Sequence, residues 1–407
     1  MSHASPPSLT APTEGSVFVI AAEESGDRLG AALANALRQR CGTSLRMAGV
    51  GGRQMQQAGV PSLFPIEDLA ILGFAEIPRR LPVLLARIRQ AADAVLKAAP
   101  DVLVIIDSPD FTHRVAKRVR AANPDIAIVD YVCPTVWAWR PWRARAMRRY
   151  IDHVLALLPF EPETLQRLGG PPCTYVGHPL AERIGELRPN REEARRRLAE
   201  PPILLLLPGS RGSEIKRLLT IFGEAILRLR RSCGELEVVL PTVPHLRARI
   251  EAEIADWPYR PRIVVDEDEK AASFRVARAA LAKSGTVTLE LALAGVPTVA
   301  AYRVSMIEAV VARLMLQVET VILANLVLGE RIVPEFLQND CTAERLAAAL
   351  LPLLNDGPER QRQLEAFSRL DAVMEIGRQA PAARAAEAVL KMLSRPARKF
   401  ADWSAKM

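Results

Sequence analysis

Two carboxylates, Asp107 and Asp110, follow directly on the apolar run LVII at residues 103–106, with Pro109 between them. An ionised carboxylate at the end of a buried strand must be solvated, paired or used in chemistry, because burying it uncompensated is costly. A carboxylate within hydrogen-bond reach of a hydroxyl group can take its proton as a general base. These two residues are therefore the first candidates for acid–base chemistry.

A second polar turn, EESGDRLG at residues 23–30, follows the apolar run 17–22. Small residues let the backbone approach a ligand, and a helix N-terminus favours an anion or a polar group. A plain helix cap formed by Ser25 or Asp27 is an equally good alternative. The dinucleotide fingerprint G-x-G-x-x-G is absent from this turn and from GVGG at 49–52. The candidate ligand contacts of the turn are Glu23, Ser25, Gly26 and Asp27.

The turn KSGTVTLE at residues 283–290 is typical of a phosphate site. Ser284, Gly285 and Thr286 supply small side chains and backbone N–H groups at an expected helix start, which suits a pyrophosphate. Glu290 lies one helical turn beyond Thr286, where its carboxylate can accept both hydroxyls of a ribose. A capping box is the alternative, but the spacing from Thr286 to Glu290 is one residue too long for it.

A further turn, PGSRGSE at residues 208–214, carries Arg211 just beyond another apolar run. A guanidinium in this position can clamp phosphate oxygens with directed hydrogen bonds. Considered alone, however, the turn is better explained by a solvated arginine.

These turns belong to a repeated alternation of short apolar runs and amphipathic segments. The runs are continuous, as expected for parallel strands covered on both faces. We predict an α/β chain of two doubly wound, Rossmann-like domains facing across a cleft, with the active site at the carboxyl ends of the strands. The predicted strands are 17–22, 102–107, 126–132 and 153–158 in the first array, and 203–208, 236–241, 262–266, 279–283 and 296–302 in the second.

The domain boundaries follow from the charged stretch between the two arrays and from the ends of the chain. Three helices are expected at 341–354, 358–370 and 380–395. The predicted segments are a disordered tail at 1–15, an N-terminal domain at 16–185, a linker at 186–202, a C-terminal domain at 203–378, and a last helix with its tail at 379–407.

The composition is that of a soluble globular protein, with 407 residues, 49% of them hydrophobic and 25% charged. Five cysteines are scattered without paired spacing, so they indicate neither a disulfide framework nor a zinc site, and a reducing cytoplasm fits best. No apolar run approaches the roughly 18 residues needed to span a bilayer. The net charge of +8 favours an anionic partner.

In combination and in this order, ten segments resemble a known family, the lipid-A-disaccharide synthases, which are inverting glycosyltransferases of the GT-B type. The resemblance covers residues 16–395. Its carriers are AEESGDRLGA (22–31), GVGG (49–52), ILGFAEI (71–77), PDVLVIIDSPDF (100–111), YVCPTVWAWR (131–140), LLPFE (157–161), YVGHPLAE (175–182), LLPGSRGSEI (206–215), SGTVTLE (284–290) and NLVLGERIVPEFLQ (325–338).

The resemblance implies transfer of 2,3-diacylglucosamine from UDP to the 6-hydroxyl of 2,3-diacylglucosamine 1-phosphate (lipid X), with inversion, giving the β-1′,6-linked lipid A disaccharide and UDP. It implies no metal and no other cofactor. The N-terminal domain would hold the acceptor, the C-terminal domain would bind the UDP-sugar, and the last helix would cross back to the N-terminal domain.

The resemblance also implies roles for single residues. Asp107 matches the proposed general base, and Asp110 lies close enough to assist. Arg211 matches an arginine on the UDP phosphates, and its charge would help to stabilise the leaving group. The residues that match the donor site are Ser284, Gly285, Thr286, Glu290 and Asn325, with Gln338 in the same stretch as Asn325.

Three further positions leave alternatives open. Ala22 stands where the family usually has a glycine, which puts the backbone geometry of that turn in doubt. His178, in VGHP near the expected hinge, is either a substrate contact or a structural histidine, and His113 is a weaker candidate.

Acylated substrates suggest contact with an anionic membrane surface. Residues 71–89 combine apolar residues with arginines, and residues 136–149 interleave three tryptophans with arginines. A core helix with a basic edge is the alternative for the first segment. No nucleic acid is expected, because the chain shows no OB or RRM sheet on which bases would stack. We expect a cytoplasmic enzyme, peripheral to the inner face of the cytoplasmic membrane of a Gram-negative-type bacterium, with its oligomeric state open.

Two other classes of function compete with this interpretation. A UDP-sugar 2-epimerase shares the architecture, but it would turn over its donor without an acceptor. A non-catalytic nucleotide- or membrane-binding module would leave Asp107 with a structural role only.

Overall fold

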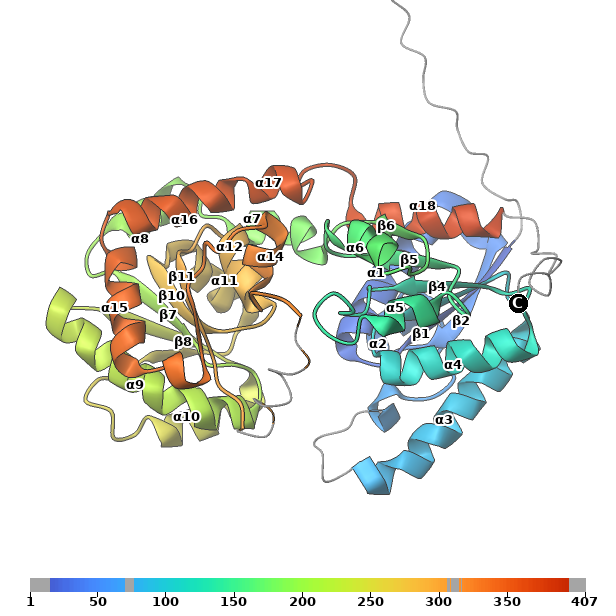
Figure 1. Ribbon diagram of the computed structural model, residues 1–407, viewed down its shortest axis with the longest axis horizontal. Helices are drawn as coiled ribbons and strands as arrows, with labels where there is room; N and C mark the ends of the chain where they lie inside the picture. Colours follow the sequence, from blue (N-terminus) through green and yellow to red (C-terminus); the bar gives the residue numbers. More distant parts are fainter. Residues whose placement is uncertain (1–14, 70–76, 306–307, 309–314, 316, 395–407) are drawn as a thin grey trace, which may run out of the picture. The chain divides into compact units, whose positions relative to one another are not determined.

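The computed structural model describes residues 15–69, 77–305, 308, 315 and 317–394 (Figure 1). The chain divides into two compact units, one formed by Met1–Pro179 together with Gln379–Met407 and the other by Leu180–Arg378. The first unit is therefore discontinuous in sequence. The tail expected at 1–15, apart from Gly15, and the end of the segment expected at 379–407, beyond residue 394, lie outside the described residues.

The first unit is built on six parallel strands in the order β2-β1-β3-β4-β5-β6 (Figure 1). The strand order changes direction between β1 and β3, the kind of switch point at which doubly wound sheets bind ligands. The strands are β1 (Gly15–Ala21), β2 (Leu45–Val50), β3 (Val102–Ile106), β4 (Ala127–Tyr131), β5 (His153–Ala156) and β6 (Cys173–Tyr175). The helices are α1 (Glu24–Cys41), α2 (Arg53–Gln57), α3 (Ile77–Ala98), α4 (Pro109–Ala122), α5 (Trp142–Met147), α6 (Glu161–Arg167) and α18 (Pro381–Leu393).

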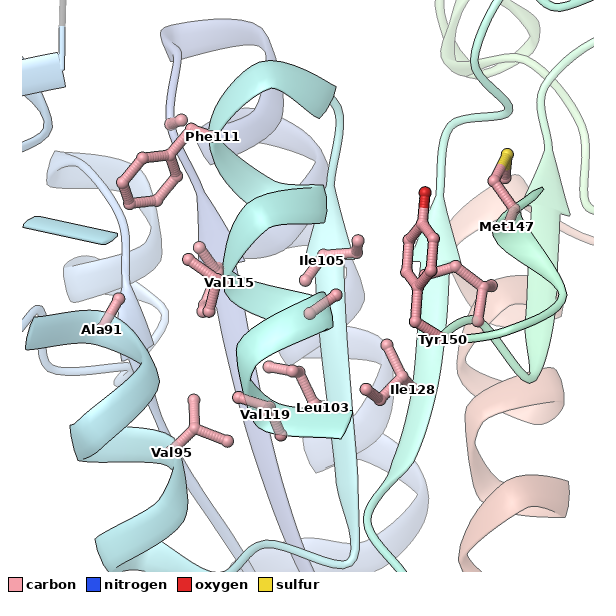
Figure 2. Packing of buried hydrophobic residues seen from close by; sticks show 14 of the residues in the cluster. Ala91, Val95, Leu103, Ile105, Phe111, Val115, Val119, Ile128, Met147 and Tyr150 are labelled. Atoms are coloured by element: carbon pink, nitrogen blue, oxygen red, sulfur yellow. The ribbon is translucent and has the colours of Figure 1, made fainter. Parts of the chain in front are cut away.

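Both faces of this sheet are covered, which explains the continuous apolar runs. Leu103 and Ile105 of β3 pack on one face against α4, where Figure 2 shows Val115 and Val119 facing them. Val102, Val104 and Ile106 of β3 point to the opposite face and pack with residues of α1 and α18. Every residue of β3 is therefore buried.

The second unit repeats the design with six parallel strands in the order β12-β11-β10-β7-β8-β9. Its switch point lies between β7 and β10. The strands are β7 (Ile203–Leu207), β8 (Glu237–Pro241), β9 (Arg262–Val264), β10 (Ala279–Lys283), β11 (Thr298–Tyr302) and β12 (Glu335–Leu337). The helices are α7 (Ile184–Leu187), α8 (Arg191–Leu198), α9 (Gly212–Cys233), α10 (Arg247–Glu253), α11 (Glu267–Val276), α12 (Val287–Leu293), α14 (Leu323–Leu328), α15 (Ala343–Leu354), α16 (Pro358–Ser368) and α17 (Leu370–Val373).

The stretch 186–202, expected as a linker, forms part of the second unit. Asn190 caps α8 through a capping box with Glu193. The buried guanidinium of Arg197 donates to the carbonyl oxygens of Phe274 and Gly295. The charged stretch therefore contains helix α8, which the buried side chain of Arg197 anchors to the second unit. The boundary between the units lies before this stretch.

Among the residues that the structure describes, no helix combines the length and the apolarity that crossing a bilayer requires.

Candidate active site

Asp107 lies directly after β3, at the switch point of the first sheet, and its backbone is left-handed, with φ of 51°. Ser108 is also left-handed, with φ of 44°. The Asp107 N–H donates to the Tyr131 carbonyl at 3.1 Å, and the Thr112 hydroxyl donates to the Asp107 carbonyl at 2.6 Å. These bonds hold a strained turn that leaves the Asp107 carboxylate half-buried at the carboxyl edge of the sheet.

The surroundings of Asp107 raise its pKa above the ordinary value of 3.8. Desolvation by burial is the largest cause, while the Ser108 N–H, which donates to Oδ1 at 2.7 Å, acts in the opposite direction. The negative charges of Glu23, in the turn after β1, and Asp130, in β4, also raise this pKa. A carboxylate with a raised pKa is a stronger base than an exposed one.

Asp110 has different surroundings, although only two residues separate it from Asp107. It lies in the first turn of α4, where its side chain is 88% exposed and Arg143 is 3.9 Å away. Solvent therefore screens its charge, and the two carboxylates are not equivalent.

Behind Asp107 lies a buried polar chain that the sequence did not reveal. The Asp130 carboxylate is 1% exposed, and its Oδ2 lies 3.0 Å from His113 Nε2. The other ring nitrogen of His113 lies 3.1 Å from the Tyr150 hydroxyl. Oδ1 of Asp130 has no hydrogen-bond partner among the described residues. The sequence signals for this buried polar chain were His113, named above as a weaker candidate, and an aspartate within the apolar run 126–132.

The turn after β1 divides into a structural part and an exposed part. Asp27 is 3% exposed, and its carboxylate accepts the N–H groups of Gly52, Gln54 and Met55 at 2.7–3.0 Å. Its predicted ligand contact is therefore replaced by a structural role at the start of α2. Gly26 is buried, and a Cβ there would lie 3.3 Å from that of Ala21, so this glycine permits close packing of α1 on the sheet. Of the four predicted contacts in this turn, Glu23 and Ser25 are exposed.

The second unit contains a cavity of about 200 Å³ at its own switch point. It is formed by the turns after β7, β8 and β10 and by the first turns of α11 and α12, and it brings together Gly285, Thr286 and Glu290 of the predicted nucleotide turn. The Glu290 carboxylate lies 3.7 Å from an Arg183 guanidinium nitrogen. The residues that line the cavity are Leu207, Gly209, Ser210, Glu214, Pro241, Thr242, Val243, Glu267, Lys270, Lys283, Gly285, Thr286, Val287 and Glu290.

The turn after β7 is organised by Glu214. Its Oε2 accepts the N–H groups of Ser210 and Arg211 at 3.0 and 3.2 Å. Gly209 has φ of 117°, and a Cβ there would lie 2.3 Å from the same carboxylate oxygen, so only glycine fits. Arg211 itself is exposed at the N-cap of α9 and does not line the cavity.

The polar side chains of three other predicted donor contacts, Asn325, Gln338 and Ser284, form hydrogen bonds within the protein. Asn325 is 1% exposed, and its amide bonds to Thr320 and to the backbone of Ile332 and Val333. The Gln338 amide, in the orientation that satisfies both its groups, pairs with the backbone of Val304 at 3.2 and 3.3 Å. The Ser284 hydroxyl is buried and donates to the Val321 carbonyl at 3.3 Å.

Comparison with known proteins identifies the family to which this geometry belongs. The family model of "Lipid-A-disaccharide synthetase" matches residues 17–389. The chain belongs to the lipid-A-disaccharide synthase family. A lipid-A-disaccharide synthase of Nitrobacter hamburgensis is 61% identical over 93% of this chain and 95% of its own length, and one of Rhodospirillum centenum is 44% identical over 93% and 95%.

The solved structures that resemble this fold are more distant. A putative UDP-N-acetylglucosamine 2-epimerase from Listeria monocytogenes superposes with a TM-score of 0.58 at 14% identity, over 93% of this chain and 95% of that one. This likeness concerns the fold, and it agrees with the two predicted doubly wound domains.

Ala22, where the resemblance led us to expect a glycine, fits its position without a left-handed backbone. Ala22 is 5% exposed, packs in the core and is not among the described residues with positive φ. The position therefore accepts a methyl group in this chain.

His178 follows β6 in the sequence, and burial lowers its pKa to about 4. Its imidazole is therefore neutral at physiological pH and can act only as a neutral donor or acceptor.

Sequence reasoning missed several charged residues that line this cavity. Lys283 is the last residue of β10, directly before the predicted turn, and Lys270 comes from α11. A lysine ending an otherwise apolar strand is the signal that would have revealed Lys283. Lys270 offered no such signal, because it lies in a charged helix.

Proposed function

We propose that Asp107 is the general base with which this chain synthesises the lipid A disaccharide. The reaction transfers 2,3-diacylglucosamine from UDP-2,3-diacylglucosamine to the 6-hydroxyl of lipid X, with inversion and release of UDP. As the new C1–O bond forms, the carboxylate takes the proton of the hydroxyl group, which is otherwise a poor nucleophile.

The observation that carries this assignment is the environment of Asp107. The carboxylate is half-buried at the switch point of its sheet, and its pKa is raised by burial, by Glu23 and by Asp130. Asp110, at 88% side-chain exposure, lacks these features. We assign Asp110 no part in proton transfer.

We assign the donor nucleotide to the cavity of the second unit. Glu290 lies where its carboxylate can accept ribose hydroxyls, and the turn of Gly285 and Thr286 borders the same space. Arg211 is exposed at the start of α9 and does not line the cavity. Its guanidinium would therefore bind the phosphates from outside the cavity wall.

The experiment incubates UDP-2,3-diacylglucosamine and lipid X with wild type, Asp107→Asn and Asp110→Asn, and identifies products by mass spectrometry. We expect the wild type to form disaccharide 1-phosphate and to leave the donor unchanged when lipid X is omitted. Asp107→Asn should lose at least ~10²-fold in kcat, the lower range for general-base catalysis, while UDP still inhibits. Asp110→Asn should retain most activity. Substantial turnover by Asp107→Asn would overturn the assignment of the base.

We also propose that the first unit contacts an anionic membrane surface on the cytoplasmic side of the inner membrane. On α3, Leu81 and Val83 are 42% and 46% exposed, and Trp142 at the start of α5 is 63% exposed. Two arginines, Arg140 and Arg143, lie over the ring of Trp139. Exposed apolar groups beside arginines favour an anionic interface. Residues 71–76 of the predicted membrane segment 71–89 lie outside the described residues.

A further inference from the structure

Lys283 has no role in the assignments above, yet it lies at the switch point of the second sheet. It is the last residue of β10, lines the donor cavity and has a side chain that is only 20% exposed. A cation that is largely withdrawn from solvent must be compensated by neighbouring groups. Those neighbours define what else the cation can bind.

Three distances describe where the Lys283 ammonium group lies. Nζ lies 3.1 Å from Glu214 Oε1 and 5.2 Å from the centre of the Tyr302 ring. A Cβ placed on Gly285 would lie 3.5 Å from the same Nζ. The side chain therefore folds back along the turn that follows its own strand, and its charge lies beside Gly285.

Glu214 in turn joins this ammonium to the turn after β7. One carboxylate oxygen binds Lys283, and the other accepts the N–H groups of Ser210 and Arg211. The carboxylate is 12% exposed. One partly buried ion pair thus joins the two turns that border the switch point.

We propose that Lys283 binds the diphosphate of the UDP-sugar donor and that Glu214 positions it. The inference rests on the proposed function of the cavity as the donor site. An ammonium group has three N–H donors, and Glu214 engages one side of it, which leaves donors for phosphate oxygens. When the sugar C1–O bond to the diphosphate breaks, its electron pair goes to the diphosphate oxygen, the acceptor oxygen bonds to C1, and its proton passes to Asp107. Lys283 stabilises the charge that develops on the departing UDP.

Lys270 provides a matched comparison in the same cavity. Its Nζ lies 3.4 Å from Glu267, and with Glu290 and Arg183 it also lines a smaller adjoining pocket. Lys270 is thus associated with the part of the site assigned to the ribose.

The test compares inhibition constants of uridine, UMP and UDP against the donor for wild type, Lys283→Met, Lys283→Arg and Lys270→Met. The measured quantity is the preference for UDP over uridine. A charge-assisted hydrogen bond is worth about 1.5–3 kcal/mol, so Lys283→Met should lower this preference ~10- to 100-fold and leave uridine nearly unaffected. Lys283→Arg should keep most of the preference, and Lys270→Met should change all three constants by a common factor.

Glu214→Gln tests separately whether Glu214 positions Lys283, because this variant retains the lysine. Loss of the Glu214 carboxylate that holds Lys283 should lower the preference for UDP over uridine. Circular dichroism would check that each variant is folded. An unchanged preference in Lys283→Met, or an equal loss for uridine and UDP, would overturn the role of Lys283. A wild type that shows no preference for UDP over uridine would instead overturn the donor site itself.

Discussion

At the scale of single residues, Asp107 and Asp110 have the same chemistry and opposite surroundings. Asp107 is partly withdrawn from water and faces the negative charges of Glu23 and Asp130. Asp110 projects from a helix into solvent. Burial and neighbouring charge therefore separate two carboxylates that are adjacent in sequence.

Replacing Glu23 should move the acid limit of activity. Asp107 can act as a base only when it is ionised, so activity falls as pH decreases through its raised pKa. Glu23→Gln removes one negative charge that raises this pKa, and the acid limb of kcat/KM should shift to lower pH. The matched control is Glu24→Gln, an exposed neighbour that does not contribute to the Asp107 pKa. Equal profiles for wild type and Glu23→Gln would contradict the proposed coupling.

Asp27 should affect stability more than ligand binding. Asp27→Ala leaves the N–H groups of Gly52, Gln54 and Met55 without their acceptor. Each buried donor left unsatisfied costs about 1–3 kcal/mol, so the free energy of unfolding should fall by about 3 kcal/mol or more. Urea denaturation measures this loss. Ser25→Ala, at an exposed position in the same turn, should change stability by less than about 0.5 kcal/mol.

At the scale of elements, α3 changes its exposure along its length. Ile88, Ala92 and Val95 are buried in the core cluster that α3 shares with β3 and α4, whereas Leu81, nearer the start of the helix, is 42% exposed. Apolar residues along one face of a helix predict a contact with the core. In α3 only the later turns make this contact. The earlier turns are left for another surface.

Polar substitutions at this end of α3 should weaken membrane binding. Full burial of an apolar side chain of this size contributes about 1.5–3 kcal/mol. The double variant Leu81→Ser, Val83→Ser loses two such side chains, so its partition into vesicles should fall ~10-fold or more. Vesicles containing anionic lipid and flotation measure the bound fraction. Gln90→Ser, an exposed position on the same helix, is the control. If the double variant floats like wild type, the proposed contact of α3 is wrong.

The edge strands show why part of the fold escaped prediction. Strands β6 and β12 have three residues each, and each lies at the edge of its sheet, where no long apolar run is needed. Strand β2 also lies at an edge and exposes Arg46. The central strands were predictable because both their faces are buried.

At the scale of the whole molecule, the first unit depends on the last helix of the chain. Ala385, Ala386 and Val389 of α18 are fully buried in the core cluster that also contains residues of β1 and α1. Segments more than 300 residues apart in sequence thus share one core.

Val389→Asp should therefore destabilise the first unit while the second keeps the cavity that we propose as the donor site. Placing an unpaired carboxylate in this core is expected to cost more than about 4 kcal/mol. Urea unfolding should show an early transition for the first unit, and UDP binding should persist beyond it. Lys391→Ala, on the exposed side of α18, should cost less than about 1 kcal/mol. A single, unshifted transition in Val389→Asp would contradict this account.

The sequence by itself determined the α/β class, the central strands and the family, because apolar periodicity and ordered motifs are local properties. It also indicated the turns after β1, β3, β7 and β10. Which residues of those turns face a ligand was decided only by tertiary structure. Asn325 and Asp27 carry the polar groups a ligand site needs, but backbone N–H groups from other segments occupy them. Lys283 acquires its position only when β10 pairs with β7 and brings it to Glu214.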